Sequence, residues 1–279
     1  MSPTSRRASV RREPSGAVRR QAKFWDGRYR GDPTYFGPDA SPFLGWVLAA
    51  LRGRKVGPTW VELGSGYGRD LVGIQGQGFF ARGVDVSPVG TALARRSGLE
   101  VVRDHALRFL QRLPPESVNV VFSNLFFNME FSQGDHQRFV RAVHRVLAPS
   151  GYHAYSVRSV SDRWYGRGRR VGPDMFDLAP DGPVLHFFSR EYARRLSRGR
   201  FRTVRTWEGP EEGSGFPIRV LYVLDQRLRP RGGPGRRRTE GRFTPSRASR
   251  SSRSATSGPT SRPRATGTSN ADRGPADSR

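Results

Sequence analysis

The sequence contains no cysteine, and only two of its 49 basic residues, Lys23 and Lys55, are lysine. The absence of cysteine excludes structural disulfides, zinc–cysteine clusters, thiolate catalysis and haem attachment through a CxxC motif. No apolar run approaches the roughly 18 residues that cross a membrane, and the arginine-rich N-terminus has no apolar signal core. We therefore expect a soluble cytoplasmic protein that makes no use of a membrane, and we predict no metal site.

Positive charge is present in large excess. The 279 residues carry a formal net charge of +25, and only 35% of them are hydrophobic. Such a charge is typical of proteins that bind polyanions. The alternative is a compositional bias, because arginine codons are rich in G and C and lysine codons are not. The charge alone therefore does not define a function.

The distribution of the charge predicts where the folded domain lies. Residues 1–22 carry +5 and residues 229–279 carry +10, and Phe243 is the one large apolar side chain of the second segment. Neither segment can bury enough apolar surface to offset the entropy lost on ordering. We predict two disordered arms, at 1–22 and 229–279, whose candidate partner is RNA or another polyanion. The predicted domain, 23–228, is long enough for one hydrophobic core.

Within this domain, short apolar segments alternate with helical patterns. Strands are predicted at Thr59–Leu63, Phe79–Val86, Leu99–Arg103, Ser117–Asn124 and Gly151–Val157. Helices are predicted at Ser41–Leu51, Pro88–Ser97, Asp135–Leu147 and Ser189–Ser197. This alternation favours a parallel sheet with helices on both faces. Two further strands, Phe201–Trp207 and Ile218–Asp225, follow without a helix between them and must pair antiparallel.

The most informative motif is VELGSGYGRD, at Val61–Asp70. Glycines directly after a strand allow a tight turn and the close approach of a ligand. Asp85 comes 21 residues after Gly64, at the end of the next strand, where a carboxylate suits ribose hydroxyls. The dinucleotide fingerprint is not matched, because Arg69 occupies the place of its third glycine. Glu62 would repel a pyrophosphate but suits a ligand that carries an ammonium group.

These residues resemble the class I S-adenosylmethionine-dependent methyltransferases over about residues 24–226. VELGSGYGRD is similar to the first motif of that family, GVDVS at Gly83–Ser87 to the second, and VNVVFSNLFF to the motif of the fourth strand. The resemblance implies an α/β, Rossmann-like fold with a seven-stranded, mostly parallel sheet and an antiparallel final strand. It also implies S-adenosyl-L-methionine as cofactor. The residues that it assigns to cofactor binding are Trp25, Tyr29, Glu62, Gly64, Ser65, Gly66, Gly68, Asp85, Val86, Asp104, His105, Asn124 and Leu125.

The segment FWDGRY, Phe24–Tyr29, refines the resemblance. It is similar to a segment of small-molecule methyltransferases of the thiopurine- and tellurite-resistance type, where it folds over the cofactor. Trp25 and Tyr29 would then make cation–π contacts with the sulfonium. The alternative is that the two rings fill a hydrophobic edge.

Methyl transfer from a sulfonium requires mainly positioning and the exclusion of water, so we expect no conspicuous catalytic group. The weak catalytic candidates are Asn124, Asp135 and His136, and His105 is a further candidate base. The loop that begins at Asn124 reads NLFFNMEF and lacks the prolines of the tetrad found in methyltransferases of planar amino groups. Its apolar side chains form either a substrate wall or part of the core.

The insertion at Arg158–Pro183 is arginine-rich and contains Trp164 and Tyr165. It either caps the pocket, binds phosphate or is a solvated loop. From these features we predict an enzyme that methylates a small molecule. The alternative is an RNA-associated methyltransferase or a non-catalytic nucleic-acid-binding protein that uses the basic arms.

Overall fold

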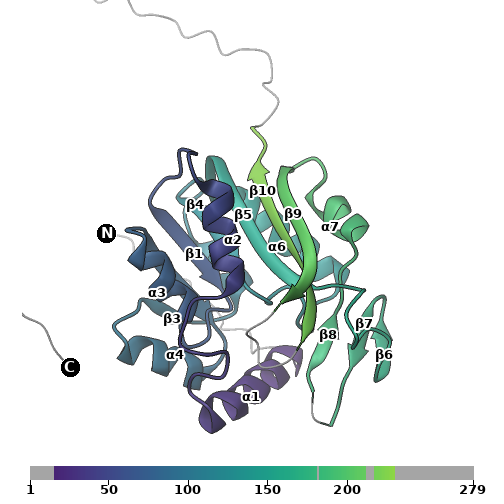
Figure 1. Ribbon diagram of the computed structural model, residues 1–279. Helices are drawn as coiled ribbons and strands as arrows, with labels where there is room; N and C mark the ends of the chain where they lie inside the picture. Colours follow the sequence, from purple (N-terminus) through teal and green to yellow (C-terminus); the bar gives the residue numbers. More distant parts are fainter. Residues whose placement is uncertain (1–15, 181, 212–216, 230–279) are drawn as a thin grey trace, which may run out of the picture. The chain divides into compact units, whose positions relative to one another are not determined.

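A computed structural model describes residues 16–180, 182–211 and 217–229 (Figure 1). The predictions made for residues 1–15 and 230–279, polyanion binding included, lie outside these ranges. No helix within them is long and apolar enough to cross a membrane.

A seven-stranded sheet forms the centre of the domain. Its strands are β1 (Thr59–Leu63), β2 (Phe80–Asp85), β3 (Val101–Arg103), β4 (Val118–Ser123), β5 (Leu147–Arg158), β9 (Phe201–Glu211) and β10 (Ile218–Arg227). Their order across the sheet is β3-β2-β1-β4-β5-β10-β9, and β10 runs antiparallel to both of its neighbours. Six strands are therefore parallel and the last strand in the chain is antiparallel, which confirms the predicted fold class.

Helices cover both faces of the sheet. Those on one face are α2 (Pro42–Leu51), α3 (Arg69–Gly76) and α4 (Pro88–Arg96), and those on the other are α5 (Ala106–Arg112), α6 (Gln133–Val146) and α7 (Arg190–Ser197). Phe43 and Trp60 are fully buried on the first side, and Phe139 and Val143 on the second. Serines are the N-caps of α2, α4, α6 and α7. The hydroxyls of Ser41, Ser87, Ser132 and Ser189 accept hydrogen bonds from first-turn N–H groups, which sets where these helices begin.

Some elements were longer than predicted or were missed. β5 begins at Leu147 instead of Gly151, because Leu147 already pairs with Val118 of β4, whereas pairing with β10 begins at Tyr152. The insertion after β5 holds a small antiparallel sheet of β6 (Arg169–Gly172), β7 (Met175–Asp177) and β8 (Val184–His186). This small sheet lies beyond the carboxyl end of β5, close to α1 in Figure 1.

The first helix, α1 (Gly16–Gly31), corrects the predicted domain boundary. Residues 16–22 were assigned to a disordered arm, but they form the first turns of this helix. Gln21 is only 9% exposed, and its amide donates a hydrogen bond to the carbonyl oxygen of Glu130. The domain therefore includes these residues, because their side chains pack onto a loop more than 100 positions later in the chain.

Candidate functional site

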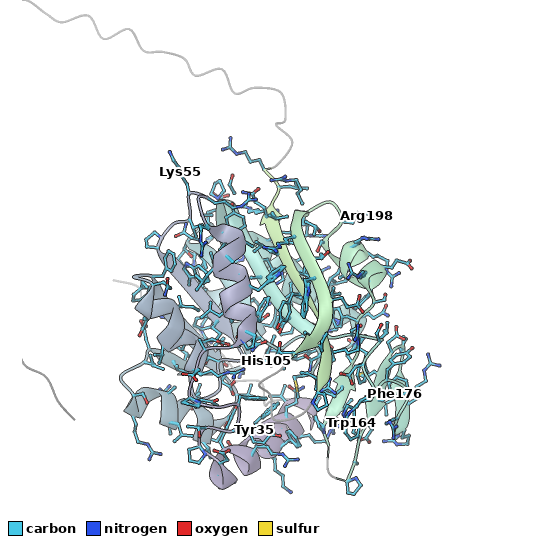
Figure 2. The ribbon with its side chains drawn as sticks, viewed as in Figure 1. Tyr35, Lys55, His105, Trp164, Phe176 and Arg198 are labelled. Carbon is cyan, nitrogen blue, oxygen red and sulfur yellow. The ribbon has the colours of Figure 1, made fainter. Side chains whose placement is uncertain are left out.

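A cavity of about 500 Å³ lies at the carboxyl ends of the parallel strands, beneath α1 and beside the small sheet. This volume is typical of small-molecule sites, and this edge is where open α/β sheets bind ligands. Figure 2 shows Tyr35, His105 and Trp164 near this end of the sheet, with Lys55 at the other end. We call the part lined by the ends of β1 to β4 the turn side. The insertion side is the part lined by the end of β5, the insertion and four residues of the loop after β4, Phe126, Asn128, Met129 and Phe131.

The glycine-rich turn after β1 adopts a conformation that requires glycine. Gly64, Gly66 and Gly68 have φ values of +73°, +53° and +89°, which side chains disfavour. A Cβ atom on Gly64 would lie 2.7 Å from Cδ2 of Phe126. The backbone of Gly64 therefore lines the cavity where a larger residue would displace a ring from the cavity wall.

Asp85 lies at the end of β2 and is held by the backbone on both carboxylate oxygens. Its Oδ2 accepts a hydrogen bond from Gly66 N at 2.9 Å, and its Oδ1 accepts one from Ser87 N at 2.7 Å. Burial raises the pKa of this carboxyl, and the backbone hydrogen bonds work against that rise. Each oxygen retains a second lone pair, so the carboxylate can also accept hydrogen bonds from the hydroxyls of a ribose.

In the turn after β3, a backbone N–H donates a hydrogen bond to the carboxylate of the preceding residue. His105 N donates to Asp104 Oδ1 at 2.7 Å, and the Asp104 carboxylate forms ion pairs with Arg108 (2.8 Å) and Arg112. Burial works to raise the pKa of Asp104, but the hydrogen bonds and the two guanidinium charges together lower it. The His105 ring caps α5 by accepting from Leu107 N at 3.3 Å. In this structure two residues that the resemblance assigns to cofactor binding are thus hydrogen-bonded to each other.

Asn124, at the end of β4, is held from two sides. Its amide nitrogen lies 3.5 Å from Asp70 Oδ2, and its Oδ1 accepts a hydrogen bond from the Ser156 hydroxyl. The same hydroxyl accepts a hydrogen bond of 2.9 Å from Leu125 N, and Leu125 has a φ of +52°. This network fixes the backbone where the chain turns from β4 into the cavity wall.

Nine of the predicted cofactor residues line the cavity: Trp25, Tyr29, Gly64, Asp85, Val86, Asp104, His105, Asn124 and Leu125. The other four, Glu62, Ser65, Gly66 and Gly68, do not line it. Oε2 of Glu62 and Oγ of Ser65 are buried without a hydrogen-bond partner among the described residues. Burial raises the pKa of Glu62 well above its usual range, which a cationic ligand nearby would reverse. The acceptor oxygens of Asp85 and Glu62 therefore fit a ligand that combines a ribose with an ammonium group.

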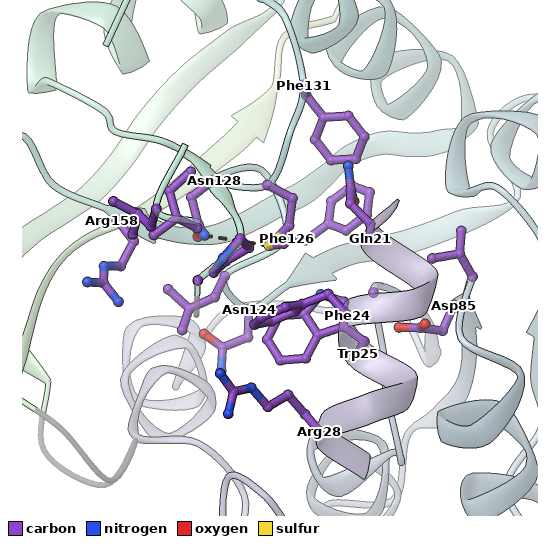
Figure 3. A pocket seen from close by; sticks show the side chains of 18 of the residues that line it. Gln21, Phe24, Trp25, Arg28, Asp85, Asn124, Phe126, Asn128, Phe131 and Arg158 are labelled. Carbon is purple, nitrogen blue, oxygen red and sulfur yellow. Dashed lines mark hydrogen bonds between the residues drawn. The ribbon is translucent and has the colours of Figure 1, made fainter. Parts of the chain in front are cut away.

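Aromatic rings of α1 form the wall opposite the turn. Trp25 and Tyr29 stack with their ring centroids 5.9 Å apart, and Trp25 also contacts Tyr35 and Phe36. Figure 3 shows Phe24 and Trp25 projecting from the helix into the cavity between Asn124 and Asp85. The rings line the cavity and pack against one another, and their cation–π contact with a sulfonium stays a prediction.

The insertion side is mainly apolar. Phe126, Met129 and Phe131 line it, whereas Phe127 is buried in the core, so the loop after β4 supplies both wall and core. Trp164 and residues 178–180, 182, 183 and 185 also line it, which makes the insertion a cap on the cavity. The polar side chains that sequence reasoning did not assign to the site here are Asn128, Arg158 and Arg163. Arg158 is the last residue of β5, as Asp85 is the last residue of β2. A polar residue at the carboxyl end of a strand was therefore a sequence signal that could have identified it.

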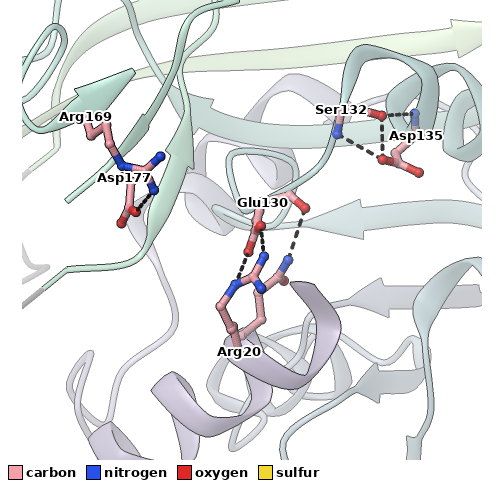
Figure 4. Close-up of polar contacts among 7 residues, drawn as sticks. Arg20, Glu130, Ser132, Asp135, Arg169 and Asp177 are labelled. Atoms are coloured by element: carbon pink, nitrogen blue, oxygen red, sulfur yellow. Dashed lines mark hydrogen bonds and ion pairs between the residues drawn. The ribbon is translucent and has the colours of Figure 1, made fainter. Parts of the chain in front are cut away.

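The structure brings neither Asp135 nor His136 to the cavity. His136 is fully buried, with Nε2 2.8 Å from the Phe127 carbonyl oxygen and Nδ1 2.8 Å from the Tyr192 hydroxyl. Burial, with the nearby ring of His186, lowers the pKa of His136 to about 3. Asp135 forms a capping box with Ser132 at the start of α6 (Figure 4). Both side chains are engaged in holding α6.

Residues 61–155, which run from the glycine turn to β5, match the family described as methyltransferase domain. Over these residues the chain is similar to methyltransferases. No curated protein matches the chain in sequence.

Solved structures of similar fold include methyltransferases. An S-adenosylmethionine-dependent methyltransferase from Methanosarcina mazei is 16% identical, with 68% of this chain and 99% of that one covered and a TM-score of 0.58. The 1,6-didemethyltoxoflavin-N1-methyltransferase of Burkholderia thailandensis, solved with its substrate and S-adenosylhomocysteine, is 20% identical, with coverages of 78% and 93% and a TM-score of 0.56. At these identities the likeness concerns the fold.

Proposed function

We propose that this protein transfers the methyl group of S-adenosylmethionine to a small molecule bound on the insertion side of the cavity. The observation that carries the proposal is the continuity of the cavity. One continuous cavity joins Asp85 and the glycine turn to an apolar wall of Phe126, Met129 and Phe131. A capped space of about 500 Å³ suits a small acceptor better than a polymer.

The cofactor supplies an activated methyl group on a sulfonium. The residues of the chain would then bind and orient the cofactor and the acceptor, and they would exclude water. Asp85 would hold the ribose, Gly64 would let the backbone approach, and Trp25 would cover the site from α1. His105 is the one histidine among the described lining residues, and its Nδ1 is engaged in capping α5. We therefore expect an acceptor atom that carries no proton of high pKa, so that a side-chain base is not needed.

Two further observations favour a small acceptor. The segment FWDGRY, which resembles the thiopurine- and tellurite-resistance type, supplies Trp25 and Tyr29 to the cavity. The Burkholderia thailandensis protein of similar fold binds a small heterocycle, 1,6-didemethyltoxoflavin.

Isothermal titration calorimetry of the full chain with S-adenosylhomocysteine tests the cofactor half of the proposal. We expect a dissociation constant in the micromolar range, and an absence of binding would refute the proposal. Measuring cofactor consumption across panels of small aromatic and aliphatic acceptors, with total RNA as one acceptor, tests the other half. Turnover on a small molecule supports the proposal, whereas turnover on RNA alone would replace it with the nucleic-acid alternative.

A further inference from the structure

Arg158 has one guanidinium nitrogen engaged by a carboxylate and retains unused donors for a ligand. It is the last residue of β5, its side chain is only 12% exposed, and it lines the cavity. Its Nη2 lies 3.0 Å from Oδ1 of Asp162, while its Nε is buried without a partner among the described residues. A half-buried arginine with unused donors is a built site for an oxygen anion, because its planar fork matches a carboxylate.

Asp162 sets the orientation of this guanidinium. Its carboxylate is fully buried and accepts backbone hydrogen bonds from Trp164 N at 2.8 Å and Arg219 N at 2.6 Å. Because two backbone N–H groups hold this carboxylate, it stays in place and does not depend on Arg158 for its position. The ion pair therefore fixes the guanidinium at the end of β5, on the insertion side.

The remaining charges on the cavity wall favour an anionic ligand. Arg28 and Arg163 also line it, and the lining acids within the described residues are Asp85 and Asp104, both on the turn side. Glu130, in the loop of the insertion side, is paired with Arg20 and does not line the cavity (Figure 4). The insertion side thus offers positive charge with no lining carboxylate to oppose an acid.

The surroundings of Arg158 favour a flat ligand. The guanidinium of Arg163 lies over the ring of Trp164, with 5.5 Å between its Cζ and the ring centroid. Phe126 and Phe131 face the same space, with their ring centroids 5.0 Å apart. Asn128, 3% exposed, adds an Oδ1 without a partner among the described residues, while its Nδ2 donates to Sδ of Met129 at 3.9 Å.

We propose that the methyl acceptor is an aromatic acid whose carboxylate is bound by Arg158. The inference rests on the proposed function, since it assigns the substrate class of the same site. Arg158 is then the residue that determines specificity, and the phenylalanines and Trp164 receive the aromatic ring.

The test compares 2-naphthoate with its neutral isostere 2-naphthamide, each titrated into the full chain saturated with S-adenosylhomocysteine. Binding is followed by calorimetry and by quenching of tryptophan fluorescence. We expect the carboxylate to bind at least tenfold more tightly than the amide, which is the scale of one hydrogen bond to a charged group. Arg158→Gln should bring the two affinities to within about twofold of each other, with the affinity for S-adenosylhomocysteine unchanged.

Arg169→Gln is the matched control. Arg169 lies in the same insertion and pairs with Asp177, but it is 75% exposed and does not line the cavity (Figure 4). This variant loses the same charge and should keep the full preference for the carboxylate. If Arg158→Gln does not fold, the double variant Arg158→Gln/Asp162→Asn replaces the buried ion pair with two amides and should give the same loss of preference.

Three results would overturn the inference: equal affinity of the wild-type protein for the two probes, a preference that survives in Arg158→Gln, or an equal loss in Arg169→Gln. A loss of S-adenosylhomocysteine affinity in folded Arg158→Gln would also overturn it, because Arg158 would then serve the cofactor. Failure of the wild-type protein to bind S-adenosylhomocysteine would instead refute the proposed function, so the two failures are distinguishable.

Discussion

Asp26 of α1 accepts a hydrogen bond of 2.5 Å from the hydroxyl of Ser87, 61 positions later in the chain. It accepts a second, of 3.1 Å, from Val89 N, and its side chain is buried. Ser87 is the N-cap of α4, so α1 places a carboxylate at the positive end of another helix. Towards its other end, α1 is tied to the loop after β4 by the ion pair of Arg20 with Glu130. The helix therefore spans the cavity from the turn side to the insertion side.

Replacing Asp26 with alanine should detach α1 from α4. We expect the free energy of unfolding to fall by about 1–3 kcal/mol, because the Ser87 hydroxyl and Val89 N lose a buried acceptor. We also expect weaker binding of S-adenosylhomocysteine, because Trp25 lies on the same helix. Asp26→Asn, which keeps an acceptor oxygen, is the control. Urea denaturation and calorimetry measure the two effects, and destabilisation with unchanged affinity would show that α1 does not cover the cofactor.

Asp85 is the residue on which cofactor binding should depend most. Asp85→Ala removes a carboxylate from the turn side and also releases Gly66 N and Ser87 N. We expect the dissociation constant for S-adenosylhomocysteine to rise at least tenfold, since hydrogen bonds to a charged group contribute about 1.5–3 kcal/mol each. Glu100→Gln is a control that removes an acid paired with Arg82 at a partly exposed surface. An unchanged dissociation constant in Asp85→Ala would show that Asp85 does not bind the ribose.

The parts of the fold that the sequence predicted are those specified by local pattern. β1 was predicted residue for residue, because TWVEL is an apolar run that ends at glycines of positive φ. Ser87 followed by Pro88 marked the start of α4 in the same way. Gly64 and Asp85 were placed together because parallel strands present their carboxyl ends on one edge of a sheet.

The missed features depend on partners that are distant in the sequence. The polar helix α1 is held by Asp26 and Arg20, whose partners lie 61 and 110 positions away. The strands of the small sheet are three or four residues long and show no alternation long enough to recognise. Burial of His136, by contrast, was predictable. It precedes Phe139 and Val140 by three and four residues, which places it on the apolar face of α6.

Gly64→Ala should impair cofactor binding by more than backbone strain explains. Gly64 has a φ of +73°, and a Cβ there would meet Phe126 at 2.7 Å on the cavity wall. Gly53→Ala is the matched control, because Gly53 has a φ of +75° and an added Cβ there meets nothing within 4 Å. Both variants should lose about 1–2 kcal/mol of stability from the left-handed conformation. Calorimetry should show weaker S-adenosylhomocysteine binding in Gly64→Ala only, and equal loss in both would assign the effect to stability.

His153 should make the protein less stable in mild acid. Burial lowers its pKa to about 3, while an unfolded histidine titrates near 6.5. The unfolded chain therefore takes up a proton below about pH 6.5 that the folded protein does not. The stability from neutral His153 is fully present above that pH and is lost as the pH falls towards 3. Between pH 7 and 5 this one residue should reduce the free energy of unfolding by about 2 kcal/mol.

His153→Phe isolates this contribution, because every other titrating group is the same in both proteins. The ring packs among Phe127, Tyr155 and Phe201, and its Nε2 has no partner within the described residues, so phenylalanine fits the surroundings. Urea denaturation at pH 7 and pH 5 should show a smaller loss of stability in His153→Phe than in the wild-type protein, by about 2 kcal/mol. Parallel losses in the two proteins would mean that His153 is protonated in the folded state, and that its burial does not exclude the proton.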